Sequence, residues 1–160
     1  MTTLSDTPQE ADIRRLIAQH ATVPGGLMPL LHAIQDACGF VPSAAVPWIA
    51  TGLNLSRAEV HGVITYYHHF RSAPAGRHVV QVCRAEACQA CGSEALMAHA
   101  QQVLGCAEHE TRADGAVTLE PVYCLGLCAS APSVQIDDRL HARMTPAKLE
   151  RLLQPLEVLK

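Results

Sequence analysis

Six of the seven cysteines lie between positions 83 and 128, and four of them form two closely spaced pairs. Cys83 and Cys88 make a C-x4-C pair, and Cys124 and Cys128 make a C-x3-C pair. Thiolate sulfur binds both zinc and iron–sulfur clusters, and four thiolates complete the ligand set of either group. Because cytosolic proteins rarely form structural disulfides, so many cysteines in such a chain predict metal or redox chemistry.

The spacing and surroundings of the pairs favour a 2Fe–2S cluster over zinc. Structural zinc sites usually contain a C-x2-C pair or a slightly longer one, and neither of these pairs is C-x2-C. Arg84 is the only basic residue within either cysteine segment. The negative charge of a cluster with four thiolates must then be balanced largely by backbone N–H groups, which Gly126 allows to approach closely. A zinc-stabilised interaction module without a redox role is the alternative of another class.

Cys91 offers two other ligand arrangements. Cys83, Cys88 and Cys91 match the plant-type ferredoxin spacing, with Cys124 or Cys128 as the distant fourth ligand. Cys88 and Cys91 also form a C-x-x-C sequence, which is typical of thioredoxin-like dithiols. The first alternative leaves one cysteine of the second pair unused, and the dithiol leaves three without a role, so we prefer the two pairs. The isolated cysteines, Cys38 and Cys106, are assigned no function.

The elements that must position these cysteines belong to an α+β fold. Residues 1–75 are expected to form a helical segment, with helices beginning near residues 8, 28, 43 and 56. The last of these is expected to begin with a capping box of Ser56 and Glu59 and to carry Tyr67 on its apolar face. Pro and Gly cluster at residues 72–76 and mark a boundary. Residues 76–160 then read as strand (78–82), helix (93–104), a polar exposed loop (108–115), strand (116–123), hairpin (133–143) and a last helix from residue 145. Each cysteine pair directly follows a predicted strand, so the two segments can meet at one edge of a sheet.

The cysteine pairs and several other segments resemble a known family. The two pairs, followed by Ala131-Pro132, resemble the small 2Fe–2S subunit of complex I and its relatives, and residues 62–70 resemble an aromatic segment of that family. Residues 31–36, 83–90 and 120–128 are more particularly similar to the gamma subunit of soluble, NAD-dependent, molybdenum-containing formate dehydrogenases. The resemblance covers residues 13–153. Cys91 departs from it, because that branch tends to have an apolar residue there.

The resemblance implies an electron-transfer subunit with a thioredoxin-like 2Fe–2S ferredoxin domain. Carried over position by position, Cys83, Cys88, Cys124 and Cys128 would bind one 2Fe–2S cluster, which relays or stores electrons beside a flavin. FMN and NAD would lie on one partner subunit, and the molybdenum cofactor on a large catalytic subunit that oxidises formate. The alternatives within the family are the equivalent subunits of NADH-quinone oxidoreductase and of NAD-linked hydrogenases.

Composition excludes several other functions. Neither half of the chain has a basic excess (4 Lys and Arg against 5 Asp and Glu before residue 76, then 8 against 10), so nucleic acid is not an expected partner. The uncharged residues 37–56 contain Pro and Gly and do not predict membrane insertion. The N-terminus has no signal-peptide pattern, which predicts a cytoplasmic protein. The sequence has no Gly-x-Gly-x-x-Gly motif and no P-loop, so we expect no autonomous substrate or NAD site and no catalytic residue.

Histidines recur at helical spacing after residue 56. His61, His68 and His69 would share one face if a single helix ran through them. A metal site would need a further ligand there, so a polar helix face or a subunit interface is the preferred interpretation.

Overall fold

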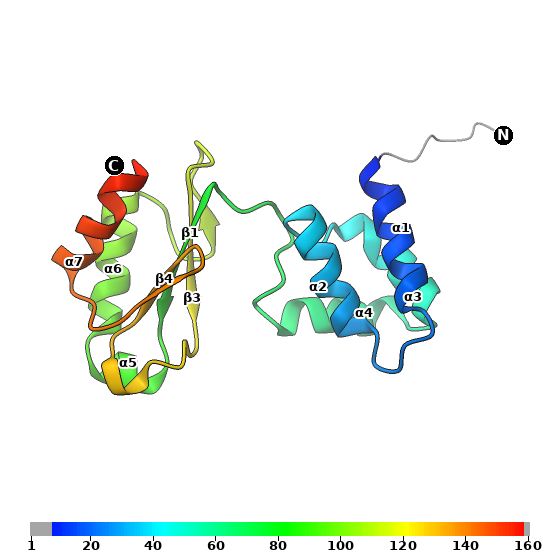
Figure 1. The fold of residues 1–160 in the computed structure, drawn as a ribbon, viewed down its shortest axis with the longest axis horizontal. Helices are drawn as coiled ribbons and strands as arrows, with labels where there is room; N and C mark the ends of the chain where they lie inside the picture. Colours follow the sequence, from blue (N-terminus) through cyan, green and yellow to red (C-terminus); the bar gives the residue numbers. More distant parts are fainter. Residues whose placement is uncertain (1–7, 159–160) are drawn as a thin grey trace. The chain divides into compact units, whose positions relative to one another are not determined.

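The computed structural model describes residues 8–158. The chain divides into two compact units, Met1–Pro74 and Ala75–Lys160. Figure 1 shows helices alone in the first unit, and a sheet with helices in the second. None of the helices among the described residues is long and apolar enough to cross a membrane.

Within residues 8–74, the first unit is built from four α-helices around one apolar core. They are α1 (Pro8–His20), α2 (Leu27–Cys38), α3 (Val46–Leu53), which follows the short 3-10 helix η1 (Ser43–Ala45), and α4 (Arg57–Tyr66). The core is formed by one apolar stripe from each helix, which includes Ile13, Leu30, Ile34, Ile49 and Val60.

Two of these helices show how the sequence sets their ends. Helix α2 ends at Gly39, whose φ of 81° suits glycine, and whose N–H donates to the carbonyl of Gln35 at 2.7 Å. Helix α4 begins with a capping box: Ser56 accepts from the Glu59 N–H, and the Glu59 carboxylate accepts from the Ser56 N–H. The hydrogen bonds from Ser56 hold the pKa of Glu59 below its ordinary value.

The second unit contains a five-stranded sheet and three α-helices. The strands are β1 (His78–Cys83), β2 (Glu110–Thr111), β3 (Val117–Val122), β4 (Val134–Ile136) and β5 (Arg139–His141). The helices are α5 (Glu86–Ala90), α6 (Ser93–Leu104) and α7 (Pro146–Leu153), with the 3-10 helices η2 (Cys128–Ser130) and η3 (Gln154–Leu156). The α+β fold with N-terminal helices, predicted from the sequence, is confirmed.

Strand β1 lies at the centre of the sheet, whose order is β2-β3-β1-β4-β5. It pairs in parallel with β3 and antiparallel with β4, while β2 and β5 pair antiparallel at the two edges. Helices α5 and α6 lie in the connection from β1 to the parallel strand β3 (Figure 1). The carboxyl ends of β1 and β3 therefore lie side by side.

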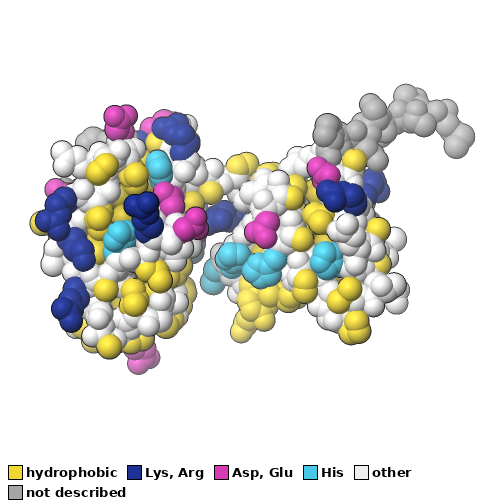
Figure 2. Space-filling model, viewed as in Figure 1, with side chains coloured by type: hydrophobic (Ala, Val, Ile, Leu, Met, Phe, Trp, Pro, Cys, Tyr) yellow, Lys and Arg dark blue, Asp and Glu magenta, His cyan; other side chains and the backbone are white. Residues whose placement is uncertain are grey.

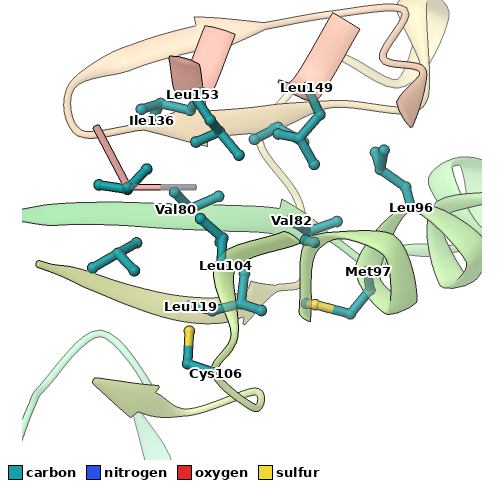
Figure 3. Packing of buried hydrophobic residues seen from close by; sticks show 14 of the residues in the cluster. Val80, Val82, Leu96, Met97, Leu104, Cys106, Leu119, Ile136, Leu149 and Leu153 are labelled. Carbon is teal, nitrogen blue, oxygen red and sulfur yellow. The ribbon is translucent and has the colours of Figure 1, made fainter. Parts of the chain in front are cut away.

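One face of the sheet packs against helices α6 and α7. Figure 3 shows Val80, Val82 and Leu119 of the central strands directed toward side chains of these helices. Leu104 from α6 and Leu149 from α7 are fully buried in this cluster. Burial of such side chains is the main stabilising contribution to the domain that carries the cysteines.

Three expectations from the sequence need correction. Residues 108–115, expected as an exposed loop, contain strand β2, and Arg112 within them donates to the carbonyls of Leu104 and Val158. Tyr67, expected on the apolar face of α4, is 45% exposed. Helix α4 ends at Tyr66, so His68 and His69 do not continue the face that carries His61.

Candidate functional site

The two cysteine segments begin at neighbouring strand ends. Cys83 is the last residue of β1 and lies opposite Val122, the last residue of β3. The N–H of the next residue, Arg84, donates to the carbonyl of Val122 at 2.7 Å, which keeps the chains adjacent beyond the sheet. Cys124 follows Val122 by two residues. The parallel pairing of β1 and β3 thus brings the C-x4-C and C-x3-C segments together.

The first pair is buried. Cys83 and Cys88 are 2% and 1% exposed. Cys88 lies in helix α5, which begins at Glu86, shortly after β1 ends at Cys83. The N–H of Cys83 donates to the carbonyl of Ser133 at 3.0 Å, so the first segment is also joined to the residue before β4.

The second pair is exposed and is shaped by unusual backbone. Cys124 has a φ of 149°, a conformation that L residues rarely adopt and that is typical of ligand clamps and active sites. Two residues later, Gly126 has a φ of 75°, and its N–H donates to the Cys124 Sγ at 3.3 Å. Cys128 begins the 3-10 helix η2 and hydrogen-bonds the Cys124 thiol. The expected approach of the Gly126 backbone to a sulfur is therefore present.

Hydrogen bonds to sulfur favour the ionised form of Cys83. Burial alone would raise the pKa of this thiol. Hydrogen bonds outweigh burial and hold the pKa below its ordinary value; they come from the Ala85 backbone, the Cys88 side chain, the Leu125 backbone and the Ser133 side chain. Since the thiolate is the metal-binding form, these contacts prepare Cys83 for a cationic ligand.

The four thiols act on one another across the two pairs. The hydrogen bond with Cys124 and the negative charge of that residue raise the pKa of Cys128, with smaller effects from burial and from the charges on Cys88 and Cys83. The Leu125 backbone of the second segment also hydrogen-bonds the Cys83 sulfur of the first. Such repulsion among thiolates is relieved by bound metal cations, which deprotonate their thiol ligands.

The arrangement fits a cluster with two irons. Among residues 8–158, no group of three or more His, Cys, Asp or Glu side chains is arranged so that it could hold a metal ion. The four cysteines form two closely spaced pairs, Cys83 with Cys88 in the first segment and Cys124 with Cys128 in the second. A 2Fe–2S cluster with four cysteines uses two thiolates on each iron, so its ligand set consists of two such pairs.

Arg84 does not supply a free positive charge to this site. Its guanidinium donates to Glu94 of α6 through Nε and Nη2 and to Glu108 through Nη1. These two carboxylates compensate the one cation in the cysteine segments. Uncharged groups, among them the backbone N–H of Gly126, are then the donors that face the sulfurs, as the composition of the segments suggests.

The remaining cysteines lie apart from these contacts. Cys91 is exposed at the C-terminal end of α5, Cys106 is buried in the core of the second unit, and Cys38 packs against the core of the first. Sequence reasoning missed Ser133, whose hydroxyl lies 3.5 Å from the Cys88 Sγ. No local pattern marks this serine, because it contacts a residue 45 positions away.

The surface charge is mixed. On the face shown in Figure 2, basic and acidic side chains of the described residues are interspersed and do not form one continuous basic area. Nothing on this face resembles the basic footprint of a nucleic-acid-binding protein.

Comparison with known proteins identifies the family. Residues 13–157 match the family described as Thioredoxin-like [2Fe-2S] ferredoxin. The chain belongs to this family. The thioredoxin-like domain implied by the resemblance and the 2Fe–2S cofactor predicted from the cysteine pairs are thereby confirmed at the level of the family.

Relatives of this ferredoxin are components of NADH-quinone oxidoreductases. The chain is 36% identical over 143 residues to such a component from Rhizobium meliloti, covering 89% of this chain and 85% of the relative. It is 38% identical over 124 residues to the corresponding NADH-quinone oxidoreductase component from Pseudomonas aeruginosa, covering 78% of this chain and 75% of the relative.

Solved structures show the same fold in a larger protein. A chain of the NAD+-reducing [NiFe]-hydrogenase in the H2-reduced state superposes with a TM-score of 0.66 at 23% identity. The match covers 82% of this ferredoxin and 22% of the hydrogenase chain, and it concerns the fold alone.

Proposed function

We propose that this ferredoxin is the small electron-transfer subunit of a cytoplasmic, NAD-linked oxidoreductase complex. One 2Fe–2S cluster would be bound by Cys83, Cys88, Cys124 and Cys128 within residues 76–160, and residues 1–75 would form the helical segment that precedes this domain. The observation that carries the proposal is the meeting of the C-x4-C and C-x3-C segments at the ends of the parallel strands β1 and β3. When bound, such a cluster accepts and releases one electron at a time.

The chain's own groups would hold the cluster and stabilise its charge. The backbone N–H of Gly126 donates to Cys124, and the backbones of Ala85 and Leu125 hydrogen-bond Cys83. These neutral donors stabilise negative charge on sulfur without a nearby cation, and they are fixed by the fold before an electron arrives.

The two cysteine pairs differ in burial, so the site has one shielded side and one accessible side. Cys83 and Cys88 are buried, whereas Cys124 and Cys128 are exposed. A redox partner can therefore approach the second pair closely, while the first pair stays shielded from water. We infer that electrons exchange with the flavin of a partner subunit through the side of Cys124 and Cys128.

Anaerobic purification tests the cofactor. The proposal requires a brown protein with about two iron and two sulfide per chain and an electron paramagnetic resonance signal after reduction. A colourless protein with one zinc per chain would instead establish the zinc-stabilised interaction module.

Cysteine variants test the ligands. Cys88→Ala and Cys128→Ala should each impair cluster binding, whereas Cys91→Ala should retain iron and sulfide at the level of the unmodified protein. Loss of the cluster in Cys91→Ala would favour the plant-type spacing. A reversible Cys88–Cys91 disulfide with reductase activity in the metal-free protein would favour the dithiol.

The candidate complexes differ in the evidence that supports them. The relatives support an NADH-quinone oxidoreductase type of complex. The fold shared with an NAD+-reducing hydrogenase makes an NAD-linked hydrogenase a further candidate. Formate dehydrogenase is supported only by the likeness of residues 31–36, 83–90 and 120–128 to its gamma subunit. We therefore place NADH-quinone oxidoreductase first and formate dehydrogenase second.

Isolation of the native complex separates these candidates. The complex, purified through a tag on this chain, should contain FMN and reduce a quinone with NADH if the first assignment is right. Formate-dependent reduction of NAD together with bound molybdenum would establish formate dehydrogenase, and hydrogen-dependent reduction of NAD would establish the hydrogenase.

A further inference from the structure

Ser133 contacts both residues of the buried pair. Its hydroxyl oxygen lies 3.5 Å from the Cys88 Sγ, and its backbone carbonyl accepts from the Cys83 N–H at 3.0 Å. The residue itself is 1% exposed. It lies between η2 and β4, directly after the cis Ala131–Pro132 peptide bond, so it reaches the first pair from the segment that carries the second.

The chemistry of the ligands decides the direction of the hydrogen bond between Ser133 and Cys88. Between a thiol and a hydroxyl, either group can donate. A metal-bound thiolate has no proton, so the Ser133 hydroxyl must then be the donor and the sulfur the acceptor. Because Cys83 and Cys88 are buried, bulk water does not compete for this contact.

Such a donor favours the reduced state of a bound cluster. Reduction adds one negative charge that is shared with the sulfurs, and a hydrogen bond to a more negative acceptor is stronger. Hydrogen bonds to the sulfurs are among the factors that set the potentials of iron–sulfur clusters.

We propose that the Ser133 hydroxyl is a positioning and tuning group, which raises the reduction potential of the cluster by donating to the buried thiolate of Cys88. The inference rests on the proposed cluster site. It goes beyond that proposal because it assigns a control of potential to a residue that is not a ligand.

The backbone of Ser133 allows this role to be separated from support of the fold. Its carbonyl accepts from the Cys83 N–H at 3.0 Å, and this bond remains in any side-chain variant. Ser133→Ala therefore removes the hydroxyl alone. Ser133→Thr keeps a hydroxyl, and Ser133→Val has the shape of threonine without it, so these two variants form a matched pair.

A redox titration monitored by electron paramagnetic resonance tests the proposal. In Ser133→Ala, the ratio of reduced to oxidised cluster at a fixed potential should fall roughly three- to tenfold; tenfold corresponds to about 59 mV for a one-electron couple. Ser133→Thr should stay close to the unmodified protein, and Ser133→Val should resemble Ser133→Ala. Ser130→Ala, a neighbouring serine in η2, is the control and should leave the potential unchanged.

The outcomes distinguish this inference from the function on which it rests. Absence of iron and sulfide from the unmodified protein would overturn the cluster itself. Full loading with equal potentials in Ser133→Ala and the unmodified protein would overturn only the role of the hydroxyl. If Ser133→Thr alone among the variants retains the cluster, the hydroxyl is required for assembly and the tuning role is rejected.

Discussion

Arg84 and Glu94 form a two-point contact that joins the first cysteine segment to helix α6. The Nε of Arg84 donates to one carboxylate oxygen of Glu94 at 3.0 Å, and Nη2 donates to the other at 2.7 Å. Hydrogen bonding to Glu94 is the main cause that raises the pKa of Arg84, with Glu108 contributing to the same effect. Since Arg84 directly follows Cys83, this contact holds the beginning of the segment that would bind the cluster.

Removing the charge of Glu94 should loosen that segment. The contact is half exposed on the Glu94 side, so Glu94→Gln should lower the free energy of unfolding by only about 0.5–1 kcal/mol. The Glu94→Gln variant should lose iron to a chelator faster than the unmodified protein, as measured by the decrease in visible absorbance. Glu86→Gln removes the same charge from the exposed surface of α5 and serves as the control. Equal rates in the two variants would show that the contact with Arg84 does not support the site.

The effect of substituting Gly126 should depend on its backbone conformation more than on the space available for a side chain. An added Cβ would meet no atom within 4 Å, but the φ of 75° strains any residue with a side chain. Gly126→Ala should therefore cost about 1–2 kcal/mol and displace the N–H that donates to Cys124. Gly126→Asn should be milder, because asparagine tolerates this conformation better.

Cluster retention in these two variants separates backbone strain from crowding. Iron and sulfide should decline more in Gly126→Ala than in Gly126→Asn, although asparagine is larger. The opposite order would indicate that the side chain meets an obstacle and that strain is unimportant. Gly62→Ala, in helix α4 and also without neighbours at Cβ, should leave iron content unchanged.

Secondary structure was predictable where a local pattern is long enough. Helix α6 spans the predicted residues 93–104, and the capping box of Ser56 and Glu59 forms as expected. Helix α5 and strand β2 have five and two residues, which is shorter than the roughly 11 residues and roughly 4 residues over which a helical or a strand periodicity can be recognised, and both were missed. The helix expected to reach Tyr67 ends one residue earlier, because Tyr67 is extended.

The candidate site was predictable as a set of residues but not as a set of contacts. Cysteine spacing and the preceding strands indicated which segments meet, because parallel strand ends lie at one edge of a sheet. The contact of Ser133 with Cys88 and the compensation of Arg84 by Glu108 join residues 45 and 24 positions apart. Such contacts depend on tertiary structure, and no periodicity in the sequence encodes them.

Gln35 should stabilise the first unit through two backbone groups. Its Nε2 donates to the carbonyl of His69 and its Oε1 accepts from the N–H of Arg71, both at 2.7 Å. The side chain is 6% exposed, so Gln35→Leu would leave both backbone groups without this partner in a shielded position. We expect a loss of about 1–3 kcal/mol in the free energy of unfolding.

Urea denaturation of the cluster-loaded protein measures this loss. Gln19→Leu introduces the same side chain at an exposed position of α1 and should change the free energy by less than about 0.5 kcal/mol. A Gln35→Leu protein as stable as the Gln19→Leu protein would mean that water replaces the two hydrogen bonds.

His141 should make the stability of the second unit depend on pH. Burial is the main cause that lowers its pKa below the ordinary 6.5, and the positive charges of Lys148 and Arg139 add to the effect. Below pH 6.5 the unfolded chain binds more protons at this residue than the folded chain does. Its stabilising contribution is therefore complete above about pH 6.5 and is lost as the pH falls toward and through the lowered pKa.

Substitution of His141 by a residue that does not titrate tests this sign. His141→Gln should lose less stability than the unmodified protein between about pH 7.5 and about pH 5.5, measured as midpoints of thermal unfolding at equal iron content. Lys148→Met should also reduce the dependence on pH, because it removes one of the two repelling charges. If His141→Gln shows a steeper decline than the unmodified protein, the protonated imidazole is favoured in the folded state and the assigned direction is wrong.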